Sequence, residues 1–287
     1  MSSLRAHDEA SAAPAATLAA KEARLHSRLE EFDSLLIAYS GGVDSAYLAF
    51  AASRALGDRM LCVTADSPSY PRRHREMAER IAREFGLPHE FIETSEMDRP
   101  EYRANPANRC YYCKTELYEH LSELATARGF SAIADGSNAD DRGDYRPGRQ
   151  AAREFGVKSP LDDADLTKGE IRELSRRAGL PTWDEPASAC LSSRIPYQSE
   201  VTVAKLSMIE QAEDALRRHG FRVCRVRHHD TVARLEIGRD EMARALDPDI
   251  SAALVRELKA IGYQYVSLDL QGYRTGSLNE ILTLRPV

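Results

Sequence analysis

Five cysteines occur in the sequence, and two of them form the closely spaced pair Cys110 and Cys113. Two thiols separated by two residues can reach one metal ion or each other, which suits zinc, an iron–sulfur cluster or a redox pair. A tetrahedral zinc site normally uses a second such pair, and the sequence has none. The pair therefore predicts metal or sulfur chemistry, and two incidental structural thiols are the alternative.

Cys190 is a candidate third ligand for the same centre. It lies in the proline-containing segment 183–197, four residues before Arg194. Three thiolates would leave one position of a four-iron cluster open for an external sulfur or a substrate. Alternatively, Cys190 acts alone as a nucleophile, because the guanidinium of Arg194 would stabilise its thiolate. Cys62 and Cys224 lie inside apolar segments, so we expect both to be buried core residues.

A second candidate site is the string Ser-Gly-Gly-Val-Asp-Ser at residues 40–45. It follows the apolar segment 34–39 and precedes the alanine-rich segment 45–56, which predicts a turn between a strand and a helix. Backbone N–H groups and the helix N-terminus converge at such a turn, and glycines let the backbone approach an anion closely. The string matches neither a Walker A loop nor Gly-x-Gly-x-x-Gly. It predicts a phosphate site of another kind.

The elements around these motifs indicate an α/β fold. Strand-like segments at 34–39, 60–65, 90–93 and 132–134 alternate with helix-like segments. Such alternation requires right-handed crossovers and produces a parallel sheet with helices on both faces. We therefore predict a doubly wound domain over residues 18–180.

The rest of the chain divides into three parts. Residues 1–17 are rich in alanine and serine without an apolar period, which predicts a flexible arm. A proline-containing connector over 181–199 carries Cys190. Residues 200–287 combine helical and alternating strand patterns, and they predict a smaller α+β domain.

The composition excludes several classes of protein. The 287 residues are 43% hydrophobic and 29% charged, which is typical of a soluble globular protein, and no apolar run is long enough for a membrane helix. The formal net charge of −6 argues against a large surface for nucleic acid. We expect a cytoplasmic homo-oligomer that binds neither membranes nor nucleic acids.

The string at residues 40–45 resembles the PP-loop of ATP pyrophosphatases, which cleave ATP to AMP and pyrophosphate and so adenylate their substrates. The resemblance implies that Asp44 and Ser45 take part in this step. Mg²⁺ is expected as well, because a cation that bridges phosphate oxygens neutralises charge on the leaving pyrophosphate. The nucleotide-binding residues that the resemblance implies are Ala38, Ser40, Gly41, Gly42, Val43, Asp44, Ser45, Thr64, Ala65, Gly136 and Asp140.

Asp140 and its neighbour Asp141 follow the fourth predicted strand. Carboxyl ends of parallel strands meet at one edge of a sheet, so these side chains could lie near the phosphates and Mg²⁺. A solvated acidic turn is the alternative.

A more specific similarity comes from several strings together. The chain is similar to the LarE family of ATP-dependent sulfur transferases, which build the nickel-pincer cofactor of lactate racemase, over about residues 20–280. The similarity implies that the protein adenylates a carboxylate of pyridinium-3,5-biscarboxylic acid mononucleotide and converts it to a thiocarboxylate. The strings that carry the similarity are 40–45, 135–141, 146–148, 159–161 and 183–196.

The family similarity implies one of two sulfur donors. Some members sacrifice the sulfur of the cysteine that matches Cys190, and others hold a [4Fe-4S] cluster on cysteines that match Cys110, Cys113 and Cys190. We expect the cluster, because a lone Cys-x-x-Cys pair has little other purpose here. A sacrificial Cys190, a tRNA thiolase, an ammonia-using synthetase and a nucleotide-binding regulator without enzyme activity are the alternatives.

The C-terminal domain offers candidate substrate contacts. Arg225 and Arg227 alternate along a predicted strand and so project from one of its faces, which suits the phosphate of an anionic mononucleotide. Glu236 on the partner strand is a candidate metal ligand, and a cross-strand ion pair is the alternative.

Overall fold

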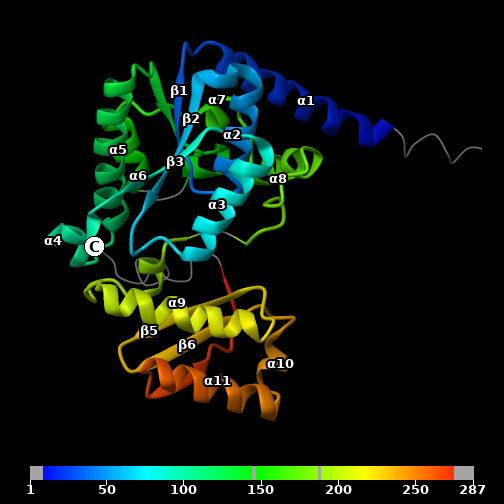
Figure 1. Ribbon diagram of the computed structural model, residues 1–287. Coiled ribbons are helices and arrows are strands. Elements are labelled where there is room, and N and C mark those ends of the chain that lie inside the picture. The colour runs from blue at the N-terminus through cyan, green and yellow to red at the C-terminus, as the bar shows by residue number, and fades with distance from the viewer. Residues whose placement is uncertain (1–8, 144–146, 187–188, 275–287) are drawn as a thin grey trace, which may run out of the picture. The chain divides into compact units, whose positions relative to one another are not determined.

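The structure is a computed structural model that describes residues 9–143, 147–186 and 189–274 (Figure 1). The chain forms two compact units. Unit 1 consists of the described parts of Met1–Asp66, Arg72–Thr94 and Lys114–Glu185. Unit 2 consists of the described parts of Ser67–Pro71, Ser95–Cys113 and Pro186–Val287.

Unit 1 is built on the predicted parallel sheet. Its strands are β1 (Leu35–Ala38), β2 (Met60–Asp66), β3 (His89–Glu93) and β4 (Ala132–Ala134), in the order β3-β2-β1-β4. All three strand pairs are parallel, which confirms the predicted α/β class. Every residue of β1 is buried because this central strand is covered on both faces, as its continuous apolar sequence predicts.

Helices cover the sheet of unit 1. Figure 1 shows α5 (Arg109–Arg128) on one side of the sheet, and α2 (Val43–Leu56) and α3 (Arg72–Phe85) on the other. The small alanines of α2 allow close packing, and they share one apolar core with α1 (Glu9–Glu30) and α8 (Lys168–Arg177). A capping box begins α8, since Thr167 and Glu170 exchange hydrogen bonds with each other's backbone.

Unit 2 contains a three-stranded sheet and two longer helices. Strand β5 (Cys224–His229) pairs antiparallel with β6 (Val232–Ile237), and β6 pairs parallel with β7 (Tyr265–Leu268). Helices α9 (Val203–Arg218) and α11 (Pro248–Ile261) contact each other, α9 also contacts β5, and residues of both helices share one apolar core with the sheet. This is the predicted smaller α+β arrangement.

The bounds of the two units differ from those of the domain predicted over 18–180. Ser67–Pro71 and Ser95–Cys113 belong to unit 2, although the sequence placed both in the doubly wound domain. The reason is long-range packing, because Tyr102 is completely buried in an apolar cluster that includes Leu191. Contacts over such sequence distances leave no periodic pattern in the sequence.

Two further boundaries can be compared with the sequence. The change from unit 1 to unit 2 after Glu185 lies inside the predicted connector, 181–199. Helix α1 starts at Glu9 and so replaces much of the flexible arm predicted over 1–17. The alanines of this segment have the highest helix propensity, which outweighs the missing apolar period. Residues 1–8 lie outside the described part of the chain.

The remaining elements are short. Among the described residues, no helix combines the length and the apolar character that crossing a membrane requires. The short elements are η1 (Gly57–Arg59), η2 (Glu96–Asp98), α4 (Pro100–Arg103), η3 (Ala139–Gly143), α6 (Pro147–Glu154), α7 (Pro160–Asp163), η4 (Leu191–Arg194) and α10 (Met242–Ala245).

The two predicted core cysteines provide a test of the packing. Cys62 is completely buried in the core of unit 1, and Cys224 is 1% exposed in that of unit 2. We predict that Cys62→Ala and Cys224→Ala each lower the free energy of unfolding by about 1 kcal/mol, because each leaves a small cavity. Urea denaturation measures this change. Cys110→Ala, at an exposed position, serves as the control and should change the stability by less than about 0.5 kcal/mol.

Candidate active site

The glycine turn at residues 40–45 connects β1 to α2 in unit 1. Gly42 is the N-cap residue of α2 and has an extended backbone, with φ −79° and ψ 165°. Because glycine has no side chain, the N-cap position offers no side-chain acceptor to the first turn of the helix. The N–H groups of that turn and the helix dipole therefore favour an anion at this end of α2.

Two glycines at this site are required by geometry. Gly41 has φ +65°, and a Cβ there would lie 2.8 Å from Cβ of Ala78 in α3. Gly136 follows β4, and a Cβ there would lie 2.9 Å from the backbone nitrogen of Ser45. Neither position accepts a larger residue unless its neighbour moves. The turn after β4 thus lies directly against the start of α2.

Serine hydroxyls hold the shape of the glycine turn. The backbone N–H of Ser40 donates to Ser45 Oγ at 3.2 Å, and the two hydroxyl oxygens lie 3.1 Å apart. Ser45 Oγ also donates to the carbonyl of Gly42 at 3.1 Å. Ser40 is exposed, whereas Val43 is buried in the core of unit 1. A ligand can therefore reach Ser40, but of Val43 only the backbone can face it.

Asp44 occupies the first turn of α2 and is contacted by two side chains. The Lys168 ammonium donates a hydrogen bond to its carboxylate, and the Asn138 amide does so at 3.3 Å. Burial raises the pKa of Asp44, whereas the positive charge of Lys168 lowers it. Lys168 is the first residue of α8, and the sequence analysis assigned it no role in this site. The structure thus adds a cation to the anion site at α2.

The acidic pair after β4 has two different environments. Asp140 is exposed, and its carboxylate accepts the backbone N–H of Lys168 at 2.8 Å. Asp141 is buried and accepts the backbone N–H of Asn138 at 3.0 Å. A solvated acidic turn therefore does not describe Asp141. Asp44 and Asp140 both bind the same lysine.

Three residues that the sequence predicted to bind the nucleotide lie in strands β1 and β2 of unit 1. Ala38 and Thr64 are both buried. Thr64 Oγ1 donates to the carbonyl of Tyr39 at 2.7 Å and lies 2.8 Å from Nε2 of His89. This hydroxyl therefore connects neighbouring strands. Ala65, at the carboxyl end of β2, is half-buried and more accessible to a ligand.

The three candidate cysteine ligands all belong to unit 2. Cys110 is exposed, and Cys113 and Cys190 are half-buried. Cys190 and Cys110 interact electrostatically with Arg109, and Cys190 and Cys113 do so with Tyr102. The three thiols therefore share one neighbourhood. Within the described parts of the chain, however, no three histidine, cysteine, aspartate or glutamate side chains are arranged to hold a metal ion.

Cys190 begins a tight turn with a well-defined backbone. It is the N-cap residue of η4, and its carbonyl accepts from the backbone N–H of Ser193 at 3.0 Å and from Ser193 Oγ at 2.7 Å. The backbone N–H of Leu191 donates to the carbonyl of Ser69 at 2.8 Å. The peptide group between Cys190 and Leu191 is thus bound at both its carbonyl and its N–H, and the side chain of Cys190 is half-buried.

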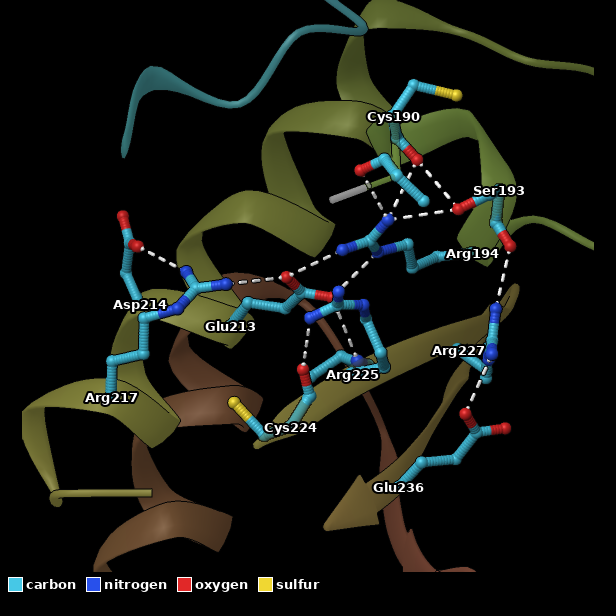
Figure 2. Close-up of polar contacts among 12 residues, drawn as sticks. Cys190, Ser193, Arg194, Glu213, Asp214, Arg217, Cys224, Arg225, Arg227 and Glu236 are labelled. Carbon is cyan, nitrogen blue, oxygen red and sulfur yellow. Dashed lines mark hydrogen bonds and ion pairs between the residues drawn. The ribbon is translucent and has the colours of Figure 1, made fainter. Parts of the chain in front are cut away.

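Arg194 contacts this turn differently from the prediction. Its Nη1 donates to the carbonyls of Ala189 and Cys190 at 2.8 and 2.9 Å, and its Nε donates to Glu213 at 2.8 Å. Figure 2 shows the sulfur of Cys190 pointing away from this guanidinium. The structure therefore corrects the predicted role of Arg194, because the arginine binds the backbone of the turn rather than the thiolate. Spacing along the chain indicated that Arg194 is close to Cys190, but it carried no information on the direction of the side chain.

Glu236 also differs from its predicted role as a metal ligand. It is completely buried and forms ion pairs with Arg227 at 2.8 Å and with Arg234 at 3.3 Å. These are the ion pairs that the sequence left as the alternative, and Figure 2 shows the one with Arg227. Arg225 is buried as well and donates to the carbonyl of Cys224. Two buried guanidiniums therefore occupy one face of β5.

Two relatives match this chain over nearly its whole length. An uncharacterised protein of Synechocystis sp. is 45% identical over 90% of this chain and 99% of its own. The pyridinium-3,5-bisthiocarboxylic acid mononucleotide synthase of Lactiplantibacillus plantarum is 34% identical over 93% of this chain and 97% of its own. The chain belongs to the LarE family. This confirms the family that the sequence motifs predicted.

A more distant relative matches a part of this LarE family member. The glutamine-hydrolysing GMP synthase of Rippkaea orientalis is 26% identical over 64% of this chain and 39% of its own. No protein-family model matches the chain. This match covers only a part of each chain.

The sequence located the motifs of this LarE family member but missed the residues that hold them. Lys168 and Arg109 had usable signals, since one opens a helix after the acidic pair and the other directly precedes Cys110. The sequence signal for Glu213 was weaker, because it consisted of a glutamate beside the apolar face of α9. Their partners are far away in sequence, so the contacts could not be predicted.

Replacing Glu213 tests how much its negative charge stabilises the protein around the Cys190 turn. Burial alone would raise the pKa of this carboxyl, but the positive charges of Arg194, Arg225 and Arg217 lower it to about 2, from an ordinary value of 4.5. A lowered pKa contributes stability above pH 4.5 that is lost as the pH falls from there toward 2. We predict that Glu213→Gln lowers the free energy of unfolding at pH 7 by about 3 kcal/mol, because buried guanidiniums lose their counter-charge.

Urea denaturation at several pH values measures this effect. The stability difference between the wild type and Glu213→Gln should shrink as the pH is lowered from 5 toward 2. Glu200→Gln, at an exposed ion pair with Arg103, is the matched control and should change stability by less than about 1 kcal/mol. A difference that stays constant with pH would show that Glu213 is not ionised in the folded protein.

Proposed function

We propose that the protein is an ATP-dependent sulfur transferase that adenylates a carboxylate of pyridinium-3,5-biscarboxylic acid mononucleotide and converts it to a thiocarboxylate. The observation that carries the proposal is the glycine turn at the start of α2, in a chain 34% identical over 93% of its length to the synthase of this product. Backbone N–H groups, the helix dipole and Lys168 favour a polyanion there. Pyrophosphate is such a polyanion.

Adenylation makes the later sulfur transfer possible. A carboxylate is a poor electrophile, so one of its oxygens first attacks the α-phosphorus of ATP. The bond between that phosphorus and the bridging oxygen breaks, and pyrophosphate leaves with the electron pair. Donors at the N-terminus of α2 stabilise the charge that develops on this leaving group.

Mg²⁺ fits the oxygen donors of the turn. Magnesium is usually held by one or two carboxylates together with substrate phosphates, and Asp44 and Asp140 are the carboxylates that bind Lys168 here. We propose these two residues as its protein ligands. The ion would neutralise negative charge on the phosphate oxygens.

Cys190 is proposed to take part in the sulfur transfer in either donor route. In the sacrificial route, its thiolate attacks the acyl carbon, and AMP leaves with the electron pair of the broken C–O bond. A base then removes the Cα proton of Cys190, that electron pair forms the Cα=Cβ bond, and the Cβ–S bond breaks. Its electrons remain on the thiocarboxylate sulfur, and dehydroalanine remains in the chain.

The alternative donor is a [4Fe-4S] cluster held by Cys110, Cys113 and Cys190, and we propose this route. Thiolates are the ordinary ligands of such clusters, and all three cysteines lie around Tyr102 and Arg109 in unit 2. The donor type therefore fits, although the described residues form no ready metal cage. When bound, the cluster would supply an open iron for a replaceable sulfide.

The products of ATP cleavage test the first step. We predict AMP and pyrophosphate in the presence of the mononucleotide, and a loss of rate of about 100-fold or more in Asp44→Ala and Ser45→Ala. A coupled pyrophosphate assay measures the rate. Ser53→Ala is the matched control, because the hydroxyl of this serine in α2 donates to the carbonyl of Phe50 within its own helix. ADP and phosphate as main products, or no pyrophosphate at all, would contradict the proposal.

A mass measurement separates the two sulfur donors. Cys190→Ala should still release pyrophosphate but form no thiocarboxylate. If the cluster is the donor, anaerobically purified protein contains about four irons, turns over repeatedly with added sulfide and keeps its mass, and Cys110→Ala and Cys113→Ala are inactive. If Cys190 is sacrificed, the chain loses the mass of H₂S once, and both variants remain active.

A further inference from the structure

The carboxylate of Asp135 connects two of the sequence strings that carry the family similarity. Asp135 directly follows β4, begins the string 135–141 and is 7% exposed. Its Oδ1 accepts a hydrogen bond from Ser159 Oγ at 2.9 Å, and Ser159 begins the string 159–161. The two strings therefore meet in the fold of unit 1, although 24 positions separate these two residues.

The same carboxylate also binds the turn that follows it. The backbone N–H of Ser137 donates to Oδ1 of Asp135 at 3.1 Å, and Ser137 Oγ donates to Oδ2 at 3.0 Å. The hydroxyl of Tyr118 in α5 donates to Oδ2 at 3.0 Å. Together with the hydroxyl of Ser159, these groups are four donors, which is about the number that the two oxygens of an ionised carboxylate accept.

These hydrogen bonds are what makes a carboxylate tolerable at this buried position. All four donors are neutral, and no lysine, arginine or histidine among the described residues forms an ion pair with Asp135. Burying a carboxylate is costly, and hydrogen bonds offset this cost. Neutral side chains offer fewer acceptor sites. A carboxylate is therefore the group that can bind the turn, α5 and Ser159 at the same time.

The turn after β4 contacts the start of α2 at two points. Gly136 lies so close that a Cβ on it would be 2.9 Å from the backbone nitrogen of Ser45. Asn138 is 4% exposed, and its side-chain oxygen accepts the backbone N–H of Asp140 at 3.0 Å. Its amide nitrogen is therefore the end that faces Asp44, to which it donates at 3.3 Å. The position of the turn thus sets the orientation of the Asp44 carboxylate.

We propose that Asp135 is a positioning residue for the adenylation site, because its carboxylate holds the turn from which Asn138 orients Asp44. The contacts run from the carboxylate to the backbone of Ser137, and from the neighbouring Asn138 to Asp44. Asp135 itself is buried and acts on the phosphates only through this turn. The inference rests on the proposed function for the role of Asp44 as a magnesium ligand.

A double-mutant cycle with magnesium pyrophosphate as the ligand tests this role. Isothermal titration calorimetry of the full-length chain, without the mononucleotide, measures the affinity of the wild type, Asp135→Ala, Asn138→Ala and the double variant. We predict that Asp135→Ala weakens binding by about tenfold in the wild type, but by less than about twofold in the Asn138→Ala background. Equal losses in both backgrounds would overturn the proposal, because a merely structural role acts independently of Asn138.

Two control variants remove donors that lie outside the turn. Tyr118→Phe and Ser159→Ala each take one hydrogen bond from the same carboxylate but leave Ser137 bound, so both should keep the affinity within about twofold. Asp135→Asn should also keep most of the affinity, because its amide oxygen can still accept the N–H of Ser137. A tenfold loss in Tyr118→Phe or Ser159→Ala would mean that Asp135 supports the fold in general, and it would overturn the proposal.

A smaller change covers the case in which Asp135→Ala does not fold. Ser137→Ala removes only the hydroxyl that donates to Asp135, so it should weaken binding by about threefold, and this loss should disappear in the Asn138→Ala background. An unchanged affinity in Ser137→Ala would overturn the proposal.

Binding of magnesium pyrophosphate requires no adenylation, so the two proposals fail separately. A wild type that binds magnesium pyrophosphate but releases none from ATP would contradict the proposed function alone. A wild type that releases pyrophosphate from ATP, with no coupling between Asp135 and Asn138, would contradict only the positioning role.

Discussion

Arg194 and Glu213 form an ion pair in which each side chain is only 1% exposed. Removing two charges from water is costly, so such a pair persists only when hydrogen bonds satisfy its remaining atoms. Arg194 meets this condition by donating to the carbonyls of Ala189 and Cys190, and Glu213 by accepting from Arg217 and from the backbone of Val226. The pair thereby connects the Cys190 turn to α9 and β5, and the conformation of this turn depends on it.

In unit 1, the arrangement around the start of α2 depends instead on a steric constraint. The start of α2 is approached by α3 at Gly41 and by the turn after β4 at Gly136, and each contact leaves no space for a Cβ. These approaches bring Asn138 and Lys168 to the carboxylate of Asp44. Close backbone packing thus brings together three separate segments of the chain at the site proposed for pyrophosphate.

The two halves of the proposed reaction use residues of different units. The residues proposed for adenylation belong to unit 1, whereas Cys110, Cys113 and Cys190 belong to unit 2. Helix α5 begins at Arg109, carries the Cys110–Cys113 pair in unit 2 and continues in unit 1. The residues proposed for adenylation and those proposed for sulfur transfer therefore have separate structural supports, and a substitution in one core need not disturb the other.

The sequence alone determined the features that depend on local pattern. Apolar runs and glycine turns predicted the parallel sheet, and the strings around residues 40–45 and Cys190 identified the LarE family. Only the tertiary structure decided that Arg194 meets Glu213 and that Lys168 meets Asp44, and it selected the ion pair with Arg227 from the two roles that the sequence left open for Glu236. Buried charges are stable only beside specific partners, and those partners are chosen by packing between distant segments, which leaves no signal in local spacing.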